Sequence, residues 1–382
     1  MNTSSKLSKK DPSVELMRII GAIMVVGTHV KLAPVINNHL SKTSVSLSCL
    51  VGDGVSLFWL ILGFYLFNNT DYFTHIKKTT RRVVIPMVCY SLFLFYFRDF
   101  IISPSSSVIT HHSLADYKNL TVGGFLKLRN TVSDCGQFWY LYAYIVIILF
   151  FPALLGIVQY KAESKHRDAI LLGIMGALLL INDLTLNEFM GFSHAPFQGA
   201  FAAAFIIIFG HIFYRHKDLF MNRGLAALIS ILAFGVVYDI RYNIQYSLYK
   251  SDEPSTHPLY WYTLFSVASI TCIAVFAFSI NKPLRKRIPC TIINHIGRLT
   301  MGIYFVHPLV ISLLNKRNIP QRLREHYQST SGGIIMYQII MTCAVFAISF
   351  VIAEVFSLII YLVCRLIKQF RNKQTHTASS EE

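Results

Sequence analysis

The sequence predicts an all-α integral membrane protein, a bundle of about ten transmembrane helices with both termini in the cytoplasm. Of its 382 residues 54% are hydrophobic and 14% charged, and the mean hydropathy is +0.49, too apolar for a soluble domain of this length. Lys and Arg recur in short clusters between long apolar runs. Such clusters are typical of the loops between transmembrane helices.

The ten helices are predicted from apolar runs long enough to cross the hydrocarbon, about 20 residues each. They are expected at residues 14–31, 46–67, 83–102, 136–158, 168–185, 198–214, 224–240, 260–280, 291–315 and 334–364. We expect a transmembrane domain over residues 14–366 between a cytoplasmic tail at 1–13 and a polar cytoplasmic tail at 367–382. The longest connection, 103–135, is expected to be a solvated loop or a cap over the outer mouth.

The distribution of charge sets the orientation and excludes some functions. With a cytoplasmic N-terminus, the inner segments carry more Lys and Arg than the outer loops, and Arg241 falls in an outer loop. The first apolar run contains Glu15 and Arg18 and has no small-residue cleavage site, so it is expected to be retained rather than removed as a signal peptide. The net charge of +16 is spread along the chain, which argues against nucleic-acid binding. The seven cysteines show neither a disulfide nor a metal-binding spacing, so no metal site is predicted.

The first predicted helix contains three ionisable residues: Glu15, Arg18 and His29. Eleven residues separate Arg18 from His29, which is three turns plus about 20°, so both project from one face about 16 Å apart. Glu15 lies one turn before Arg18 and is placed to pair with it. Ionisable groups inside a membrane usually face a cavity or a partner, which indicates a functional site. Alternatively, Arg18 reaches the interface and His29 only bonds a neighbouring helix.

The ninth predicted helix has a similar pattern, with Arg298 early and His307 late in the run Gly302 to Pro308. His29 and His307 lie about equally far along their helices, so we expect them at one level beside a common cavity. Pro308 frees a backbone carbonyl there, which requires a wet or well-packed site.

Other candidates are weaker. Gly63 in the second helix permits close approach of a helix or of a ligand, and Asp53 either orients an imidazole or lies at the interface. Arg81 and Arg82 fit the positive-inside rule, and their guanidinium groups also suit a donor that carries phosphates. Trp139 belongs to an aromatic belt or stacks on a sugar.

Several of these segments together resemble one family, the membrane-bound acyltransferase 3 family, which includes O-acetyltransferases of surface polysaccharides. Glu15 to Arg18 followed by His29 resembles its first-helix signature of Arg, ten residues and His, with Glu15 where Asp is usual. The other matching segments are Phe58 to Tyr65, Arg81-Arg82 to Pro86, Phe138 to Leu141 and Gly302 to Pro308, in the family's order. The chain departs from the family pattern at Leu62, where Ser is usual, and at Gln137, where His is frequent.

The resemblance implies transfer of an acetyl group from acetyl-CoA, a co-substrate and not a bound cofactor, to a glycan or glycolipid hydroxyl. It is similar to the enterobacterial common antigen O-acetyltransferase type and implies a bacterial inner membrane. His29 would act as general base or as an acetylated relay, with Glu15, Arg18 and His307 in support. Arg18, Arg81 and Arg82 would bind the donor, and Trp139, Tyr304 and Gly63 would contact the substrate. The main alternative is a transporter or flippase of a lipid-linked sugar, for which no internal repeat is found.

Overall fold

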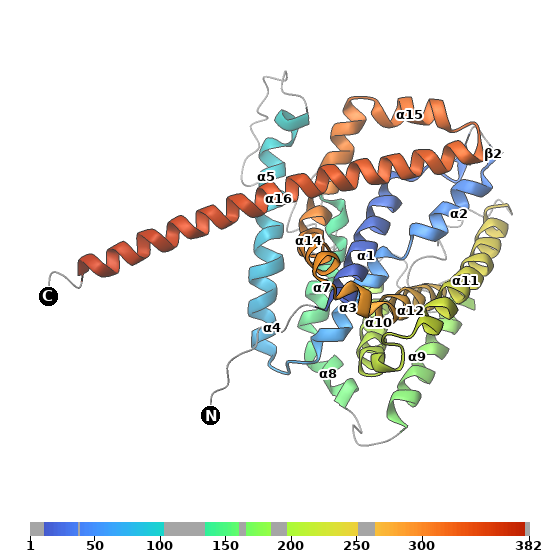
Figure 1. Cartoon of the computed structure of the whole chain (residues 1–382), viewed down its shortest axis with the longest axis horizontal. Helices are drawn as coiled ribbons and strands as arrows, with labels where there is room; N and C mark the ends of the chain where they lie inside the picture. Colours follow the sequence, from blue (N-terminus) through green and yellow to red (C-terminus); the bar gives the residue numbers. More distant parts are fainter. Residues whose placement is uncertain are drawn as a thin grey trace.

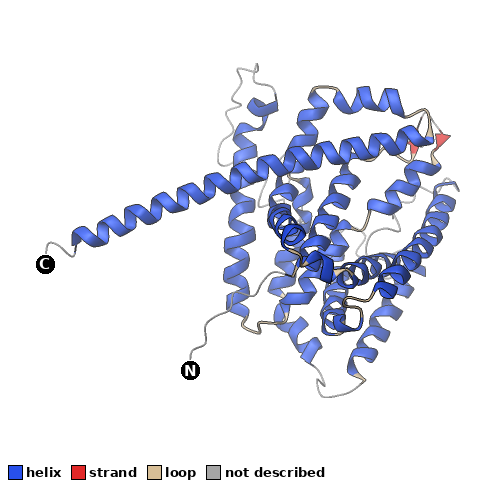
Figure 2. Cartoon of the chain, in the orientation of Figure 1, coloured by secondary structure: helices blue, strands red, loops and turns tan. Residues whose placement is uncertain are grey.

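The computed structural model describes residues 11–36, 39–102, 134–159, 166–184, 197–250 and 264–378. Within these residues every regular element is a helix except one short hairpin, as Figure 2 shows. Its strands β1 (Val35–Ile36) and β2 (His39–Leu40) pair antiparallel, with Val35 opposite Leu40. The predicted all-α class is confirmed. The loop predicted at 103–135, with Ser103 to Ser107, His111 and His112, lies almost entirely outside the described residues.

Helix α1 (Pro12–Val30) lies near the middle of the bundle in Figure 1. The Asp11 carboxylate caps its N-terminus by accepting a hydrogen bond from the Ser13 amide, and Pro12 occupies the first turn, where no helical donor is needed. Its partners are α3 (Gly54–Leu66), α14 (Arg287–Lys316) and α16 (Ser331–Ala378). The face of α1 that carries the predicted site is therefore surrounded by other helices.

Two of the predicted helices are interrupted. The second consists of α2 (Lys42–Val51) and α3, which are separated by Gly52 and Asp53. The fourth consists of the 3-10 turn η2 (Gly136–Phe138), α7 (Trp139–Leu149) and α8 (Phe151–Gln159), and the chain bends by 61° between α7 and α8. Pro152 has no amide hydrogen for the carbonyl of Ile148, which favours a break at this point.

The remaining elements follow in chain order. They are α4 (Tyr72–Thr79), the π-helix η1 (Thr80–Val84), α5 (Ile85–Ile102), α9 (Arg167–Leu184), α10 (Phe197–Arg215), the 3-10 turn η3 (Lys217–Leu219), α11 (Gly224–Lys250), α12 (Leu264–Ser279), α13 (Asn281–Leu284) and α15 (Ile319–Tyr327). The last helix, α16, crosses the bundle and extends well beyond it (Figure 1). Each of the ten predicted segments thus overlaps a helix or an interrupted helix.

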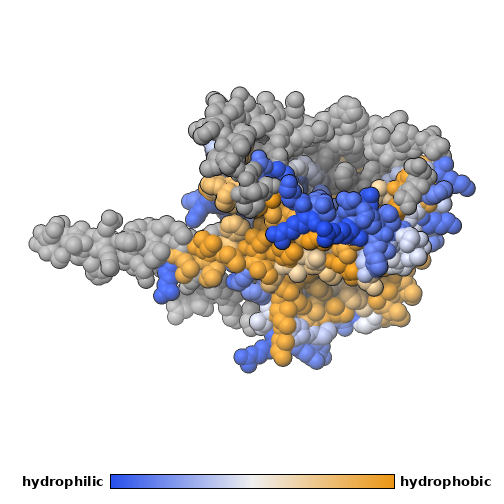
Figure 3. Space-filling model, turned by 90° about the horizontal axis from the view of Figure 1, so that it is seen from above, coloured by the Kyte–Doolittle hydropathy of each residue, from blue (hydrophilic) through white to orange (hydrophobic). Residues whose placement is uncertain are grey.

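Six helices among the described residues are long and apolar enough to cross a membrane, or seven if the bent pair α7 and α8 counts as one span. Two shorter apolar helices lie at Ala203–Arg215 and Leu264–Ser279. Figure 3 shows a broad apolar surface bordered by polar residues, as expected for a bundle surrounded by lipid. The chain is therefore a multi-pass membrane protein. The number of ten spans and the cytoplasmic position of both termini stay predictions.

Two clusters of buried apolar side chains share α1. Val14 and Met17 belong to the cluster around α3, α10 and α12, whereas Val25 and Val26 belong to the cluster around α14 and α16. Lipid provides no hydrophobic drive between helices, so close packing of small residues becomes important. Gly210 of α10 provides such a contact, because a methyl group there would come within 3.2 Å of the Leu60 carbonyl carbon of α3.

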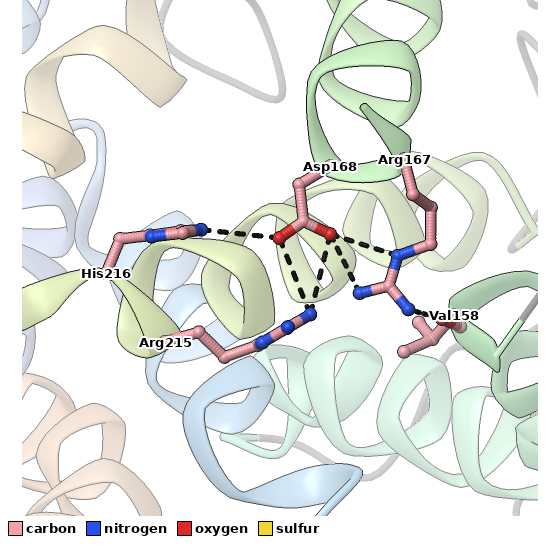
Figure 4. A network of polar contacts seen from close by, with 5 residues as sticks. All are labelled: Val158, Arg167, Asp168, Arg215 and His216. Atoms are coloured by element: carbon pink, nitrogen blue, oxygen red, sulfur yellow. Dashed lines mark hydrogen bonds and ion pairs between the residues drawn. The ribbon is translucent and has the colours of Figure 1, made fainter. Parts of the chain in front are cut away.

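An ion-pair network joins the ends of three helices (Figure 4). Asp168 accepts hydrogen bonds from Arg167 at 2.8 and 3.0 Å, and it lies 3.3 Å from Nε2 of His216 and 3.4 Å from Arg215. Arg167 also donates to the Val158 carbonyl at 3.0 Å. The end of α8, the start of α9 and the end of α10 are therefore held together at one edge of the bundle.

Candidate active site

The two predicted histidines lie side by side. The ring centroids of His29, at the end of α1, and His307, in the middle of α14, are 5.1 Å apart, and the planes are inclined by 47°. The side chain of His307 is fully buried, whereas His29 is exposed. The prediction that both imidazoles lie at one level is confirmed, and of the two His29 lines the cavity described below.

Pro308 fixes the hydrogen bonding of His307. In a continuous helix the amide of residue 308 would donate to the Tyr304 carbonyl, and proline has no such hydrogen. Nδ1 of His307 lies 2.9 Å from that carbonyl oxygen and 3.3 Å from the Ile303 carbonyl oxygen. Because a carbonyl only accepts, Nδ1 carries the proton and Nε2 carries the lone pair. Nε2 is buried and has no hydrogen-bond partner among the described residues.

His29 lines a cavity of about 90 Å³, here called the His29 cavity. Its wall also includes Thr28, Ser56, Gln137, Trp139 and Tyr304. The Thr28 hydroxyl is bonded to the carbonyls of Met24 and Val51 at 3.0 and 2.8 Å, which fixes the turn that carries His29. Because His29 is exposed and lines a small, partly polar cavity, its imidazole is accessible to a substrate.

A second cavity, of about 240 Å³, adjoins Arg18 and is called the Arg18 cavity. Arg298, Phe58 and Tyr140 form part of its wall. Tyr304 lines both cavities, and its hydroxyl donates a hydrogen bond to the backbone carbonyl of Gln137. Tyr304 therefore lies between the arginine side and the histidine side of the candidate site.

Glu15 holds Arg18 as predicted. Nη1 of Arg18 donates to Oε1 of Glu15 at 2.8 Å, with the carboxylate buried and the guanidinium about one-third exposed. Gly297 of α14 makes room for the carboxylate, since a Cβ at this position would lie 2.9 Å from Cβ of Glu15. The guanidinium is thus directed into the Arg18 cavity by a buried anion.

The other sequence candidates differ in position. Trp139 and Tyr304 face the His29 cavity. Arg81 and Arg82 are exposed on the π-helix η1 and are not among the residues that line either cavity. The expectation that a ligand approaches Gly63 needs correction, because the backbone of α10 at Ile207 and His211 fills that space. Gly63 allows helix packing and does not line either cavity.

A buried charge network behind the His29 cavity was not predicted. Asp53 and Arg241, each 1% exposed, form a two-pronged ion pair at 2.6 and 3.1 Å, and Ser266 donates to Asp53 at 2.8 Å. The hydroxyls of Ser266 and Ser56, the latter in the cavity wall, are 2.9 Å apart. Asp53 is therefore buried and paired, and the expected loop position of Arg241 is wrong, because Arg241 lies within α11. The sequence feature that could have indicated this network is the position of Arg241 directly after the apolar run 224–240.

These features define a multi-pass membrane protein whose polar site is enclosed by its own helices. The family model described as an acyltransferase domain matches residues 11–354, so the chain belongs to the acyltransferase 3 family and is a membrane acyltransferase. No curated protein and no solved structure matches the chain. The resemblance deduced from the sequence is confirmed.

Proposed function

We propose that this protein transfers an acetyl group from acetyl-CoA to a hydroxyl of a cell-surface polysaccharide or lipid-linked glycan. The observation that carries the proposal is the position of His29 and Arg18 in two cavities that share Tyr304. The proposal also rests on membership of the acyltransferase 3 family, which requires an acyl donor and an acceptor.

In the proposed reaction the acceptor oxygen attacks the thioester carbonyl carbon. A C–O bond forms, the C–S bond breaks, and the sulfur leaves with the bonding electron pair. His29 removes the proton of the acceptor hydroxyl and later delivers it to the departing thiolate. Its access to the small cavity favours this role as general base, while an acetyl-imidazole relay is the alternative that the experiment below distinguishes.

His307 is proposed to position His29. Its tautomer leaves the buried Nε2 lone pair directed away from the Tyr304 carbonyl, on a ring 5.1 Å from His29. In this proposal a rotation of His29 lets its N–H donate to this lone pair and turns its own lone pair toward the substrate. This arrangement resembles the way in which a carboxylate orients the histidine of a hydrolytic triad.

The donor is proposed to enter from the cytoplasm, with Glu15 holding Arg18 toward it. Arg81 and Arg82 are exposed cations that could attract its phosphates during approach. The acceptor is proposed to reach the His29 cavity from the membrane or the outer side, with Trp139 and Tyr304 as its contacts. This arrangement suits a protein of a bacterial inner membrane that modifies exported glycans.

The test is acetyl transfer by purified protein in detergent or proteoliposomes, with labelled acetyl-CoA and surface glycans as acceptors. His29→Ala is expected to abolish transfer and leave membrane expression unchanged. His326→Ala on the exposed surface of α15 is the matched control and should keep full activity. Normal transfer by His29→Ala would refute the role of this imidazole.

A rapid measurement of the intact protein mass at neutral pH, without acceptor, separates the two mechanisms and the transporter alternative; acid is avoided because it hydrolyses acetyl-imidazole. A general base leaves the protein mass unchanged, whereas a relay adds an acetyl group that disappears in His29→Ala. A transporter or flippase of a lipid-linked sugar would neither exchange nor consume labelled acetyl-CoA. Glycan mass spectrometry with and without the protein would identify the acceptor.

A further inference from the structure

A second arginine faces the Arg18 cavity. Arg298 follows Gly297 on α14, so it lies beside the contact between Gly297 and Glu15. The cavity is therefore bordered by one guanidinium from α1 and one from α14. Two guanidinium groups in one concave site form an arrangement suited to an anion with several oxygens, such as a phosphate.

The two arginines differ in how firmly they are held. Arg18 makes a 2.8 Å hydrogen bond with the buried Glu15. Arg298 is 55% exposed, and its contacts are longer: 3.8 Å to Oε1 of Glu354 on α16 and 3.4 Å to Nδ1 of His295. Glu354 also lies 3.7 Å from Nε2 of His295. An ion pair at 3.8 Å exceeds hydrogen-bond distance, so Arg298 keeps donors for a ligand.

The size of the cavity indicates which part of a ligand it can hold. Its 240 Å³ is below the roughly 300–1,000 Å³ of a pocket that encloses a drug-sized molecule. The aromatic rings of Phe58 and Tyr140 in its wall suit an acyl group or a slender arm more than a nucleotide. A nucleotide-bearing thioester would therefore leave its phosphates at the opening, where the exposed Arg298 lies.

We propose that Arg298, together with Arg18, binds the phosphates of the thioester donor, and that Glu354 on α16 retains Arg298 while the site is empty. The inference deepens the proposed function and rests on it. Arg298 acts here as a binding residue: its guanidinium donates hydrogen bonds to phosphate oxygens and takes no part in bond making. The charged or titratable side chains near Arg298 are Arg18, the buried Glu15, His295 and Glu354.

The test compares two donors, acetyl-CoA and acetyl-pantetheine, which share the thioester and the pantetheine arm, whereas acetyl-pantetheine lacks the phosphates together with the adenosine. For Arg298→Gln we expect about a tenfold higher KM for acetyl-CoA, as for loss of one charge-assisted hydrogen bond, and an unchanged KM for acetyl-pantetheine. Arg298→Lys should restore part of the affinity, and Glu354→Gln should lower the KM for acetyl-CoA. The matched control is Arg322→Gln on the exposed surface of α15, which should change neither KM.

The outcomes are distinct. If Arg298→Gln raises both KM values equally, Arg298 has a structural role or binds a lipid phosphate, and the inference is overturned. An unchanged KM for acetyl-CoA also overturns it, while the proposed function stands. If the wild-type protein uses neither thioester, the proposed function itself fails. The acetyl-pantetheine reaction also reports whether each variant is folded.

Discussion

Nδ1 of His307 lies 2.9 Å from the backbone carbonyl oxygen of Tyr304, the acceptor that Pro308 leaves without its helical donor. The proline thus has a specific effect on the neighbouring imidazole: it supplies an acceptor that keeps the proton on Nδ1. The same short segment provides the tyrosine between the two cavities and the histidine beside His29.

Replacement of Pro308 tests this relationship. In Pro308→Ala the new amide can donate to the Tyr304 carbonyl and compete with His307, so we expect kcat to fall about tenfold, corresponding to roughly 1.4 kcal/mol. The helix should remain intact, because alanine is the better helix former. Pro320→Ala, at the start of α15 and away from both cavities, serves as the control for a proline change. Unchanged kcat in Pro308→Ala would show that the histidine does not depend on the proline.

Gly297→Ala tests the support of Arg18. The added methyl group would lie 2.9 Å from Cβ of Glu15 and overlap its carboxylate, so the Glu15–Arg18 pair must shift. We expect a loss of about 1–3 kcal/mol in the free energy of unfolding, as for overpacking, together with reduced donor use. Thermal unfolding in detergent and the KM for the donor measure the two effects. Gly235→Ala on α11, whose added methyl meets nothing within 4 Å, should retain wild-type behaviour.

The Asp53–Arg241 pair is expected to be a major determinant of stability. Removal of one partner leaves a buried charge without compensation, which costs about 3–5 kcal/mol. Asp53→Ala and Arg241→Ala should therefore each lower the melting temperature strongly, whereas the double variant Asp53→Leu/Arg241→Met should recover much of the loss. Additive losses in the double variant would contradict this expectation. Asp239→Ala, an exposed position on the same helix α11, is the control.

Lys31, directly after the end of α1, should give the stability a pH dependence. Burial lowers the pKa of Lys31 from 10.5 to about 8. Between these values the unfolded chain binds more protons than the folded chain, so this group makes the free energy of unfolding increase with pH. Lys31→Met should accordingly be more stable than the wild type at pH 7, and the difference should narrow as the pH rises from 8 toward 10.5.

Thermal melts over this pH range provide the measurement for Lys31. Lys42→Met, at the exposed start of α2, corrects for the general loss of one lysine. A constant difference between the wild type and Lys31→Met across the range would show that Lys31 titrates normally.

Local patterns in the sequence were enough to predict much of this protein. Apolar runs predicted all ten helical segments, and helical periodicity placed Arg18 and His29 on one face. The equal depth of His29 and His307 along their helices predicted that they lie at one level, and the structure places them side by side. Pro308 was expected to free a carbonyl. That His307 donates a hydrogen bond to this carbonyl depends on a side-chain rotamer, which sequence spacing does not determine.

Features that depend on the relative placement of distant helices were not predictable in this way. Asp53 and Arg241 are 188 positions apart in the sequence, and the residues around each of them do not indicate its partner. Gly63 was equally compatible with a ligand and a helix, and only the path of α10 decides between them. Arg81 and Arg82 matched the expected motif, but the His29 cavity and the Arg18 cavity are lined by residues of other helices.

The position of Tyr304 between two separate cavities has a consequence for the lifetime of an activated thioester. A hydroxyl and a water molecule are similar nucleophiles, so in the proposed reaction a water molecule admitted with the acceptor would hydrolyse the thioester. Tyr304, whose hydroxyl is bonded to the Gln137 carbonyl, is a wall residue of both cavities. In the proposed function, an arriving acceptor would have to displace Tyr304 to bring the two cavities into contact.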